Sequence, residues 1–319
     1  MPLVKAARLL VTVLVVTLVA CQGSPTEIRV SAAASLTDAF TEIAAAFESA
    51  HPDTDVVLNF GGSSALREQI LEGAPVDVFA SANMSTMDSV VAQGEVSGGA
   101  QTFARNRLEI AVPPGNPGNV TGLVDFSRPG LLIGLCARGV PCGDFAREAL
   151  SKAGVNPSID SNEPDVRSLL TKIELGELDA GIVYATDVAS SDGGVEGIEI
   201  PEAVNVTATY PIAVLADAPN PEGAQAFVDF VLSDGRTVLS RYGFEELTLY
   251  GPAHGTGHSE VEGYWLAEQA GFVIEPNMLF NIDIWLSDGA WGLRFEDGVL
   301  TTKNGLRELT SYRREIIIL

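Results

Sequence analysis

Short apolar runs alternate with helical patterns from Ile28 to about Asp217. The runs are rich in β-branched residues, which is typical of buried strands. The predicted strands are 27–30, 56–60, 76–80, 107–112, 131–135, 180–184 and 210–215. Between them, apolar residues recur at helical spacing, as at Phe40, Ile43, Ala44 and Phe47. The further predicted helices open at Ser63 or span 85–92, 143–152, 164–175 and 221–232. This alternation predicts an α/β fold with mainly parallel sheets.

Four predicted helix starts share the same chemistry. They are Ser35, Ser63-Ser64, Pro141-Cys142-Gly143 and Pro164-Asp165-Val166. Each offers unpaired backbone N–H groups at the positive end of a helix, and the first two add hydroxyls. Ser35 or Thr37 also fits the N-cap of its helix. Capping alone explains each start taken singly, so a binding site is indicated only if the starts lie together.

A site built from these starts would use neutral donors. In a parallel sheet, ligands sit at the carboxyl ends of strands, where Tyr184 adds a phenolic O–H. None of these positions carries Lys or Arg. Several N–H and O–H donors can surround a small, fully ionised oxyanion, whereas a protonated oxyanion would face them with a donor of its own.

The composition of the chain restricts the kinds of partner that it can bind. The 319 residues are 46% hydrophobic, which allows a sizeable core, and the formal net charge is −23. An acidic chain of this kind is a poor binder of nucleic acid, which requires a basic surface. Any anion must therefore be held by local dipoles and hydroxyls against an unfavourable overall field.

The chain begins with a targeting segment. Lys5 and Arg8 precede the apolar run from Leu9 to Val19, which is short for a membrane span. The run ends in Leu18-Val19-Ala20-Cys21, which resembles the lipobox of bacterial lipoproteins. We predict a signal peptide over 1–20, lipidation at Cys21 and a tether over 21–26. The alternative is ordinary secretion with Cys21 incidental.

Only Cys136 and Cys142 remain among the cysteines. An exported chain meets an oxidising compartment, so we expect a disulfide that closes this short loop. A metal–thiolate site is disfavoured because no histidine lies near the two cysteines in sequence.

Over residues 27–245 the sequence resembles the periplasmic molybdate-binding protein (ModA) family, the solute receptors of an ABC importer. The matching segments are 32–37, 60–66, 73–82, 140–143, 163–169, 181–184, 210–214 and 241–244. The resemblance implies the type II periplasmic-binding-protein fold, with an oxyanion held between two α/β lobes. It implies no cofactor and no enzymatic activity.

The resemblance also assigns roles to five residues. Ser35 and Ser63 would donate hydroxyl and backbone hydrogen bonds, Cys142 and Val166 backbone N–H groups, and Tyr184 its O–H. Cys142 stands where the family commonly has a small residue, and Gly61-Gly62 replaces a serine-rich run. Capping for the serines and plain helix packing for Val166 remain the alternatives.

The family's two crossovers give the domain boundaries. We expect lobe 1 to span 27–106 and 213–245 and lobe 2 to span 107–212, with closure by a hinge motion. The implied role is a lipid-anchored, extracytoplasmic monomer that delivers molybdate or tungstate to an ABC importer permease. A receptor of the same fold for another oxyanion or a metal ion is the alternative.

Residues 246–319 do not belong to this pattern. They resemble a C-terminal fragment of a creatinase/prolidase-type ("pita-bread") metallopeptidase, with candidate metal ligands at His258, Asp283 and Glu296. The two aspartate ligands of that family lie upstream, in a part of the domain absent here, so a two-metal mechanism cannot be assembled. We expect a short α+β appendage, truncated and without catalysis; metallopeptidase activity is the third and weakest hypothesis.

Overall fold

A computed structural model describes residues 26–245 in full. Beyond them it describes the backbone of 253–255, 265–266, 279–287, 292–302 and 305–308. The predicted signal peptide 1–20, Cys21 and His258 lie outside the described residues, so their roles stay predictions. Thr26, expected in the tether, is already the first residue of a strand. The described residues form two compact units divided after Glu245, each treated by itself below.

The first sheet of residues 26–245 follows the strand order β2–β1–β3–β9. Its strands are β1 (Thr26–Ala33), β2 (Thr54–Gly61), β3 (Val78–Ala80) and β9 (Thr207–Leu215). β2, β1 and β3 are parallel, whereas β9 runs antiparallel to β3. Its helices are α1 (Thr37–Ala50), α2 (Ser63–Leu71), α3 (Met84–Ala92), α7 (Pro221–Leu232) and α8 (Gly235–Arg241). The apolar stripe of α1 packs on α7 through Phe47 and Phe227, whose ring centroids lie 5.4 Å apart.

The second sheet follows the order β6–β5–β7–β4, with β8 paired to β4. Its strands are β4 (Val96–Val112), β5 (Ile133–Cys136), β6 (Ser161–Glu163), β7 (Ala180–Tyr184) and β8 (Glu196–Glu199). The helices of this part are α4 (Pro141–Lys152), α5 (Val166–Glu174) and α6 (Ala185–Ala189), with a 3₁₀ turn, η2 (Leu123–Ser127). β5 and β7 are buried along their whole length, as expected of strands covered on both faces.

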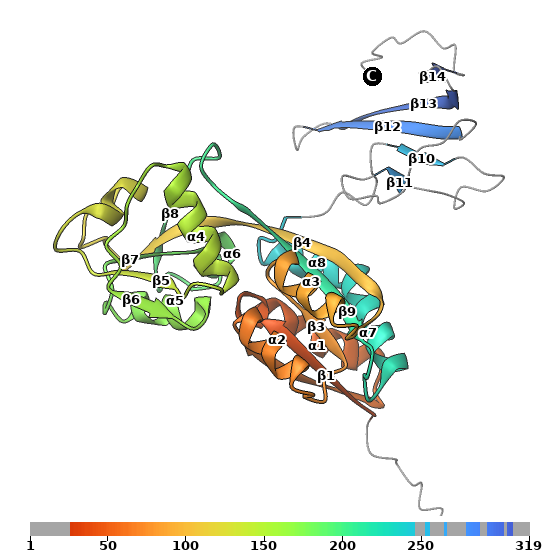
Figure 1. Cartoon of the computed structure of the whole chain (residues 1–319), viewed down its shortest axis with the longest axis horizontal. Helices are drawn as coiled ribbons and strands as arrows, with labels where there is room; N and C mark the ends of the chain where they lie inside the picture. Colours follow the sequence, from red (N-terminus) through yellow and green to blue (C-terminus); the bar gives the residue numbers. More distant parts are fainter. Residues whose placement is uncertain are drawn as a thin grey trace, which may run out of the picture. The chain divides into compact units, whose positions relative to one another are not determined.

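β4 belongs to both sheets and connects them. It pairs with β9 as far as Arg107 and with β7 from Leu108 onward. Figure 1 shows β4 and β9 running between two lobes, one carrying α4 and α5 and the other α1, α2 and α3. The expected two-lobed α/β architecture is therefore confirmed.

Two predictions about this fold are wrong. The sheets are mixed, because β4 and β9 run antiparallel to their neighbours and supply the antiparallel half of the strand pairs. β4 also begins at Val96 and not at Arg107. Its first half contains Gly98 and Gly99, both with positive φ, and its pairing with β9 is irregular there. That half lacks an apolar period, so its sequence is typical of a loop.

The second unit is described as a five-stranded antiparallel sheet in the order β11–β10–β12–β13–β14. Its strands are β10 (Ala253–Gly255), β11 (Trp265–Leu266), β12 (Leu279–Ser287), β13 (Gly292–Thr302) and β14 (Gly305–Glu308). Asp283 and Glu296 are register partners on β12 and β13, and their role as metal ligands stays a prediction. The described backbone is all strand, and the helical part of the expected α+β appendage stays a prediction.

Candidate functional site

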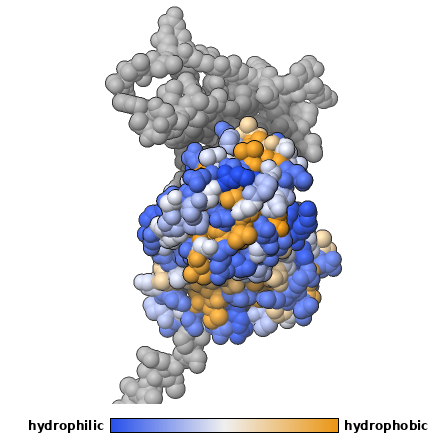
Figure 2. Space-filling model, turned by 90° about the vertical axis from the view of Figure 1, so that its left-hand side faces the viewer, coloured by the Kyte–Doolittle hydropathy of each residue, from blue (hydrophilic) through white to orange (hydrophobic). Residues whose placement is uncertain are grey.

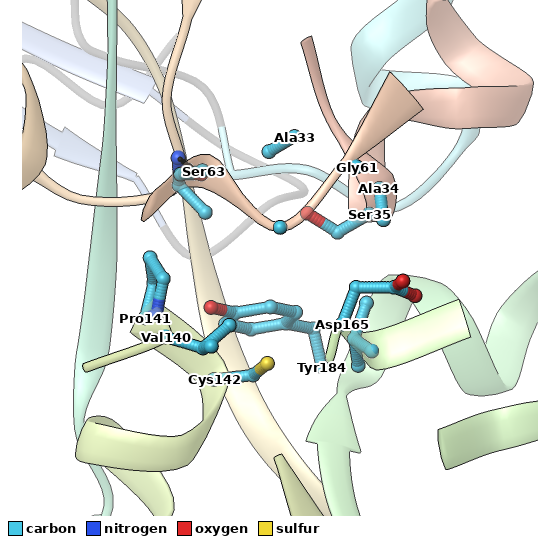
Figure 3. Close-up of a pocket in the computed structure, with 13 residues that line it drawn as sticks. Ala33, Ala34, Ser35, Gly61, Ser63, Val140, Pro141, Cys142, Asp165 and Tyr184 are labelled. Carbon is cyan, nitrogen blue, oxygen red and sulfur yellow. Dashed lines mark hydrogen bonds between the residues drawn. The ribbon is translucent and has the colours of Figure 1, made fainter. Parts of the chain in front are cut away.

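A small cavity lies where the two lobes meet. All five residues predicted to bind an oxyanion line it. Figure 3 shows Ser35 and Ser63 on one side of it and Cys142 and Tyr184 on the other. The lining consists of Ala33, Ala34, Ser35, Gly61, Gly62, Ser63, Ala82, Val140, Pro141, Cys142, Asp165, Val166 and Tyr184. The structure therefore brings together residues that are up to 149 positions apart in the sequence, Ser35 and Tyr184 being the extremes of the five.

Three of the five residues stand at helix starts. Ser63 is the first residue of α2, Cys142 the second of α4 and Val166 the first of α5. N–H groups in the first turn of a helix have no partner within the helix and lie at its positive end. Because these three helices start at one cavity, their free donors converge there from both lobes.

Ser35 reaches the cavity in a different way from the one predicted. A 3₁₀ turn, η1 (Ala34–Leu36), separates β1 from α1, and the N-cap of α1 is Leu36, without a side-chain bond. Neither Ser35 nor Thr37 caps α1, so that prediction is wrong; the Thr37 hydroxyl donates to the Ala34 carbonyl instead. The small side chains of Ala33 and Ala34 let the backbone turn tightly here, which leaves the Ser35 hydroxyl for other contacts.

The two serine hydroxyls are each held by one neighbour. Ser35 Oγ lies 2.9 Å from the hydroxyl of Tyr210, and Ser63 Oγ accepts the N–H of Ala82 at 3.0 Å. Ser63 thus keeps its own proton free to donate, and Ser35 does so as well when the Tyr210 hydroxyl is the donor of the bond between them. These contacts orient both hydroxyls without using up their capacity as donors.

Tyr184 presents an unpaired donor at the cavity. Its side chain is 1% exposed, and among the described residues its hydroxyl oxygen has no hydrogen-bond partner. Burial, with smaller contributions from Tyr210 and Asp187, raises the pKa of Tyr184 well above its usual value, so the phenol keeps its proton. A buried hydroxyl without a partner costs free energy, and a bound acceptor would recover it.

The loop before α4 is fixed covalently and by hydrogen bonds. Cys136 and Cys142 form a disulfide, as expected, with their Cα atoms 5.8 Å apart. Arg147 donates from Nη1 to the carbonyls of Cys136 and Gly143 at 2.7 and 2.8 Å. Gly143 has no room for a side chain, since an added Cβ would lie 2.1 Å from the Ala137 carbonyl oxygen. The Cys142 N–H is therefore held in one place.

The cavity is electrically neutral at its wall except for Asp165. The carboxylate of Asp165 caps α5, accepting the Ser168 N–H at 2.8 Å and the Ser168 hydroxyl at 3.0 Å. Figure 3 shows it directed away from the centre of the cavity. Within residues 26–245, no group of three or more His, Cys, Asp or Glu side chains is placed to hold a metal ion. The site therefore offers donors to an anion and no ligand set for a cation.

The two lobes touch closely beside the cavity. Gly62, between β2 and α2, faces the segment before α5, and a Cβ added to it would lie 2.5 Å from the carbonyl oxygen of Pro164. A Cβ added to the neighbouring Gly61 would make only an ordinary contact with the Leu66 side chain, at 3.5 Å. The lack of a side chain at Gly62 thus permits the backbones of the two lobes to approach each other.

Gly62→Ala should consequently weaken ligand binding about tenfold, because the methyl group would clash with Pro164 and hold the lobes apart at a cost of ~1–2 kcal/mol. Gly61→Ala is the matched control and should bind nearly as well as the wild type. Calorimetric titration of both variants measures the effect. Equal affinities for the two variants would show that the Gly62–Pro164 approach does not matter for binding.

Sequence reasoning missed the residues behind the cavity wall. Tyr210 was assigned only to a strand, yet its hydroxyl holds Ser35. Arg167 and the fully buried Asp187 lie next to Val166 and Tyr184, and neither was singled out. The only sequence signal for Asp187 is its position three residues after the end of a strand. A carboxylate there can accept a backbone N–H at the helix start, and Asp187 accepts that of Tyr184.

Two α/β lobes joined by crossing strands, with a cavity of backbone N–H and hydroxyl donors between them, define a two-lobed solute-binding protein. The chain belongs to the family described as bacterial extracellular solute-binding protein, whose sequence profile matches residues 28–245. Membership of this family indicates an extracytoplasmic location and a solute-binding function. Among the described residues, no helix is long and apolar enough to cross a membrane.

The chain is similar to several named proteins. The molybdate-binding protein ModA of Mycobacterium tuberculosis is 39% identical over 68% of this chain and 84% of its own. Among solved structures, the periplasmic molybdate-binding protein of Azotobacter vinelandii is 18% identical, with a TM-score of 0.61 over 69% of this chain and 100% of that one. The sulfate-binding protein SubI of Mycobacterium tuberculosis is 17% identical, with a TM-score of 0.64 over 70% and 88%. These two structures are similar in fold alone.

The match of the family ends at Glu245, so it does not reach the second unit. The resemblance of residues 246–319 to a metallopeptidase gains no support from these relatives and stays a prediction.

Proposed function

We propose that this protein captures molybdate, or tungstate, outside the cytoplasm and delivers it to the permease of an ABC importer. The relative from Mycobacterium tuberculosis, 39% identical over 68% of this chain, is a molybdate-binding protein, which supports this ligand. The site residues of the proposal are Ser35, Ser63, Cys142, Val166 and Tyr184, in the roles that the family resemblance implies.

The observation that carries the proposal is the buried hydroxyl of Tyr184, which has no partner among the described residues and lines a cavity without Lys or Arg. A tetrahedral dianion presents only acceptors, so every donor that points into the cavity can be paired. Hydrogen phosphate would bring a proton toward these donors and leave at least one of them unpaired. The cavity thus selects a fully ionised oxyanion through hydrogen-bond matching, without a cationic counter-charge.

The cellular setting follows from the sequence. Cleavage before Cys21 and lipidation of that residue would keep the receptor, as a monomer, close to its permease. The lobes would be 27–106 with 213–245 and 107–212, closing by rotation about β4 and β9. The sheet change within β4 between Arg107 and Leu108 supports the first of these boundaries. The second unit has no role in this proposal.

Calorimetry with molybdate, tungstate and sulfate tests the proposal on the secreted chain, alongside a version that ends at Glu245. We expect tight binding of molybdate and tungstate to both and no competition from sulfate. Binding of neither oxyanion to either version would refute the proposal. Sulfate binding as tight as molybdate binding would favour a receptor of the same fold for a different oxyanion, the class to which SubI belongs.

A further inference from the structure

Arg167 lies directly after the cavity residue Val166, yet its side chain turns away from the cavity. Its Nη2 donates to Asp38 on α1, which belongs to the other lobe. Its Nε lies 3.8 Å from Oδ1 of Asp187 on α6. The guanidinium therefore stands between a carboxylate of each lobe.

Asp187 connects this arrangement to the cavity. Its side chain is fully buried, and its Oδ2 accepts the backbone N–H of Tyr184 at 3.0 Å. Its other oxygen has no hydrogen-bond partner among the described residues and faces Arg167 across the 3.8 Å gap. One carboxylate thus fixes the backbone of the cavity tyrosine and receives its charge compensation from Arg167. Removing the cation would leave a buried charge without a partner, which is costly.

We infer that Arg167 is a positioning residue that couples closure of the two lobes to the oxyanion site, pairing with Asp38 across the cleft and with Asp187 behind Tyr184. The inference rests on the proposed function, since it assigns a role within the same binding cycle. Arg167 does not contact the ligand in this proposal, and its effect comes from the ion pair with Asp38 on the other lobe.

The two ion pairs of Arg167 differ in whether they can persist when the lobes open. Asp38 and Arg167 are 129 positions apart and lie on different lobes, so opening of the cleft must separate them. The pair between Arg167 and Asp187 lies within one lobe and survives opening. An interaction present only in the closed form stabilises that form and slows release of the ligand, while capture by the open form is largely unaffected.

The chain supplies a matched control four residues along the same helix. Glu42 on α1 pairs with Arg241 on α8, and both helices belong to one lobe. The side chains of Asp38 and Glu42 are equally exposed, at 37%. Glu42→Gln therefore removes a comparable ion pair that does not cross the cleft, and Asp38→Asn removes the one that does.

The test measures the release of radiolabelled molybdate from the purified full chain after a chase with unlabelled molybdate. Asp38→Asn should release it about two- to fivefold faster than the wild type, the upper part of the range expected for a partly exposed ion pair. The association rate should change little, and Glu42→Gln should behave as the wild type. In concentrated salt the wild type should approach Asp38→Asn, because screening weakens the pair. Arg167→Lys, which keeps the charge, should retain part of the slow release.

Equal release rates for the wild type and Asp38→Asn, or an equal acceleration in Glu42→Gln, would overturn the inference. A wild-type chain that binds no molybdate would instead remove the proposed function. Small-angle scattering of the ligand-free chain then tests the cross-lobe pair alone. A larger radius of gyration for Asp38→Asn than for the wild type and Glu42→Gln supports it, and identical radii overturn it.

Discussion

Tyr184→Phe should weaken molybdate binding by about 1–3 kcal/mol, or roughly five- to 150-fold in Kd, because one oxygen of the ligand would lose its donor in a closed cavity. Tyr184 is 1% exposed, so water cannot replace the lost hydroxyl without opening the site. Its ring packs on Tyr210, with centroids 6.0 Å apart, and phenylalanine preserves that contact. The substitution thus removes a donor and leaves the shape of the wall intact.

The same substitution should not lower the thermal stability of the ligand-free protein. The hydroxyl of Tyr184 is buried without a partner among the described residues, so its removal should leave the melting temperature of the ligand-free protein unchanged or raise it slightly. Calorimetry measures the affinity, and thermal unfolding with and without molybdate measures the stability. Tyr242→Phe, which removes a phenol at the end of α8, is the control. Unchanged affinity in Tyr184→Phe would place this residue outside the binding site.

Local pattern explains why much of the fold could be predicted from the sequence. Helices such as α1 and α7 bury one apolar stripe, and β5 and β7 are continuous apolar runs, so each shows its type over a few residues. The helix starts at Ser63, Cys142 and Val166 could be found for the same reason. Small residues or a proline next to a helical pattern mark a helix start without reference to the rest of the chain.

Contacts between distant segments could not be predicted in this way. The bond between Ser35 and Tyr210 joins residues 175 positions apart, and the approach of Gly62 to Pro164 depends on how two lobes close. Neither contact leaves a periodic signal in the sequence. The N-cap of α1 was mispredicted for a related reason, since a serine that suits a cap also suits a ligand site, and only the 3₁₀ turn distinguishes the two.

The charge balance at the site resolves an apparent conflict. A chain with net charge −23 holds its proposed dianion at a wall without Lys or Arg, so the local field must come from helix starts and hydroxyls. Asp187 would oppose the anion if it stood uncompensated behind Tyr184. Arg167 supplies the compensating positive charge. Because its side chain does not line the cavity, it makes no direct contact with the ligand.

The same carboxyl gives the second large expected effect, a loss of stability as the pH rises. Burial raises the pKa of Asp187 from 3.8 to about 6, with Arg167 and the Tyr184 N–H opposing this rise and Asp165 adding to it; Tyr210 also lies close enough to sense the charge. The folded protein thus holds this proton more tightly than the unfolded chain does. The resulting stabilisation is complete below about pH 4 and is lost as the pH rises to about 6.

Asp187→Asn should remove this dependence, because asparagine still accepts the Tyr184 N–H and carries no charge to bury. The difference of about two pH units in pKa corresponds to roughly 3 kcal/mol, so the variant should gain about that much on the wild type between pH 4 and pH 7. Denaturant unfolding of both proteins across this range measures it. The comparison of the two curves cancels the other groups, such as Glu163, whose pKa is lowered by its bonds to Lys172 and Ser161 in spite of its burial. Parallel curves would mean that Arg167 compensates the Asp187 charge fully, and the raised pKa would be wrong.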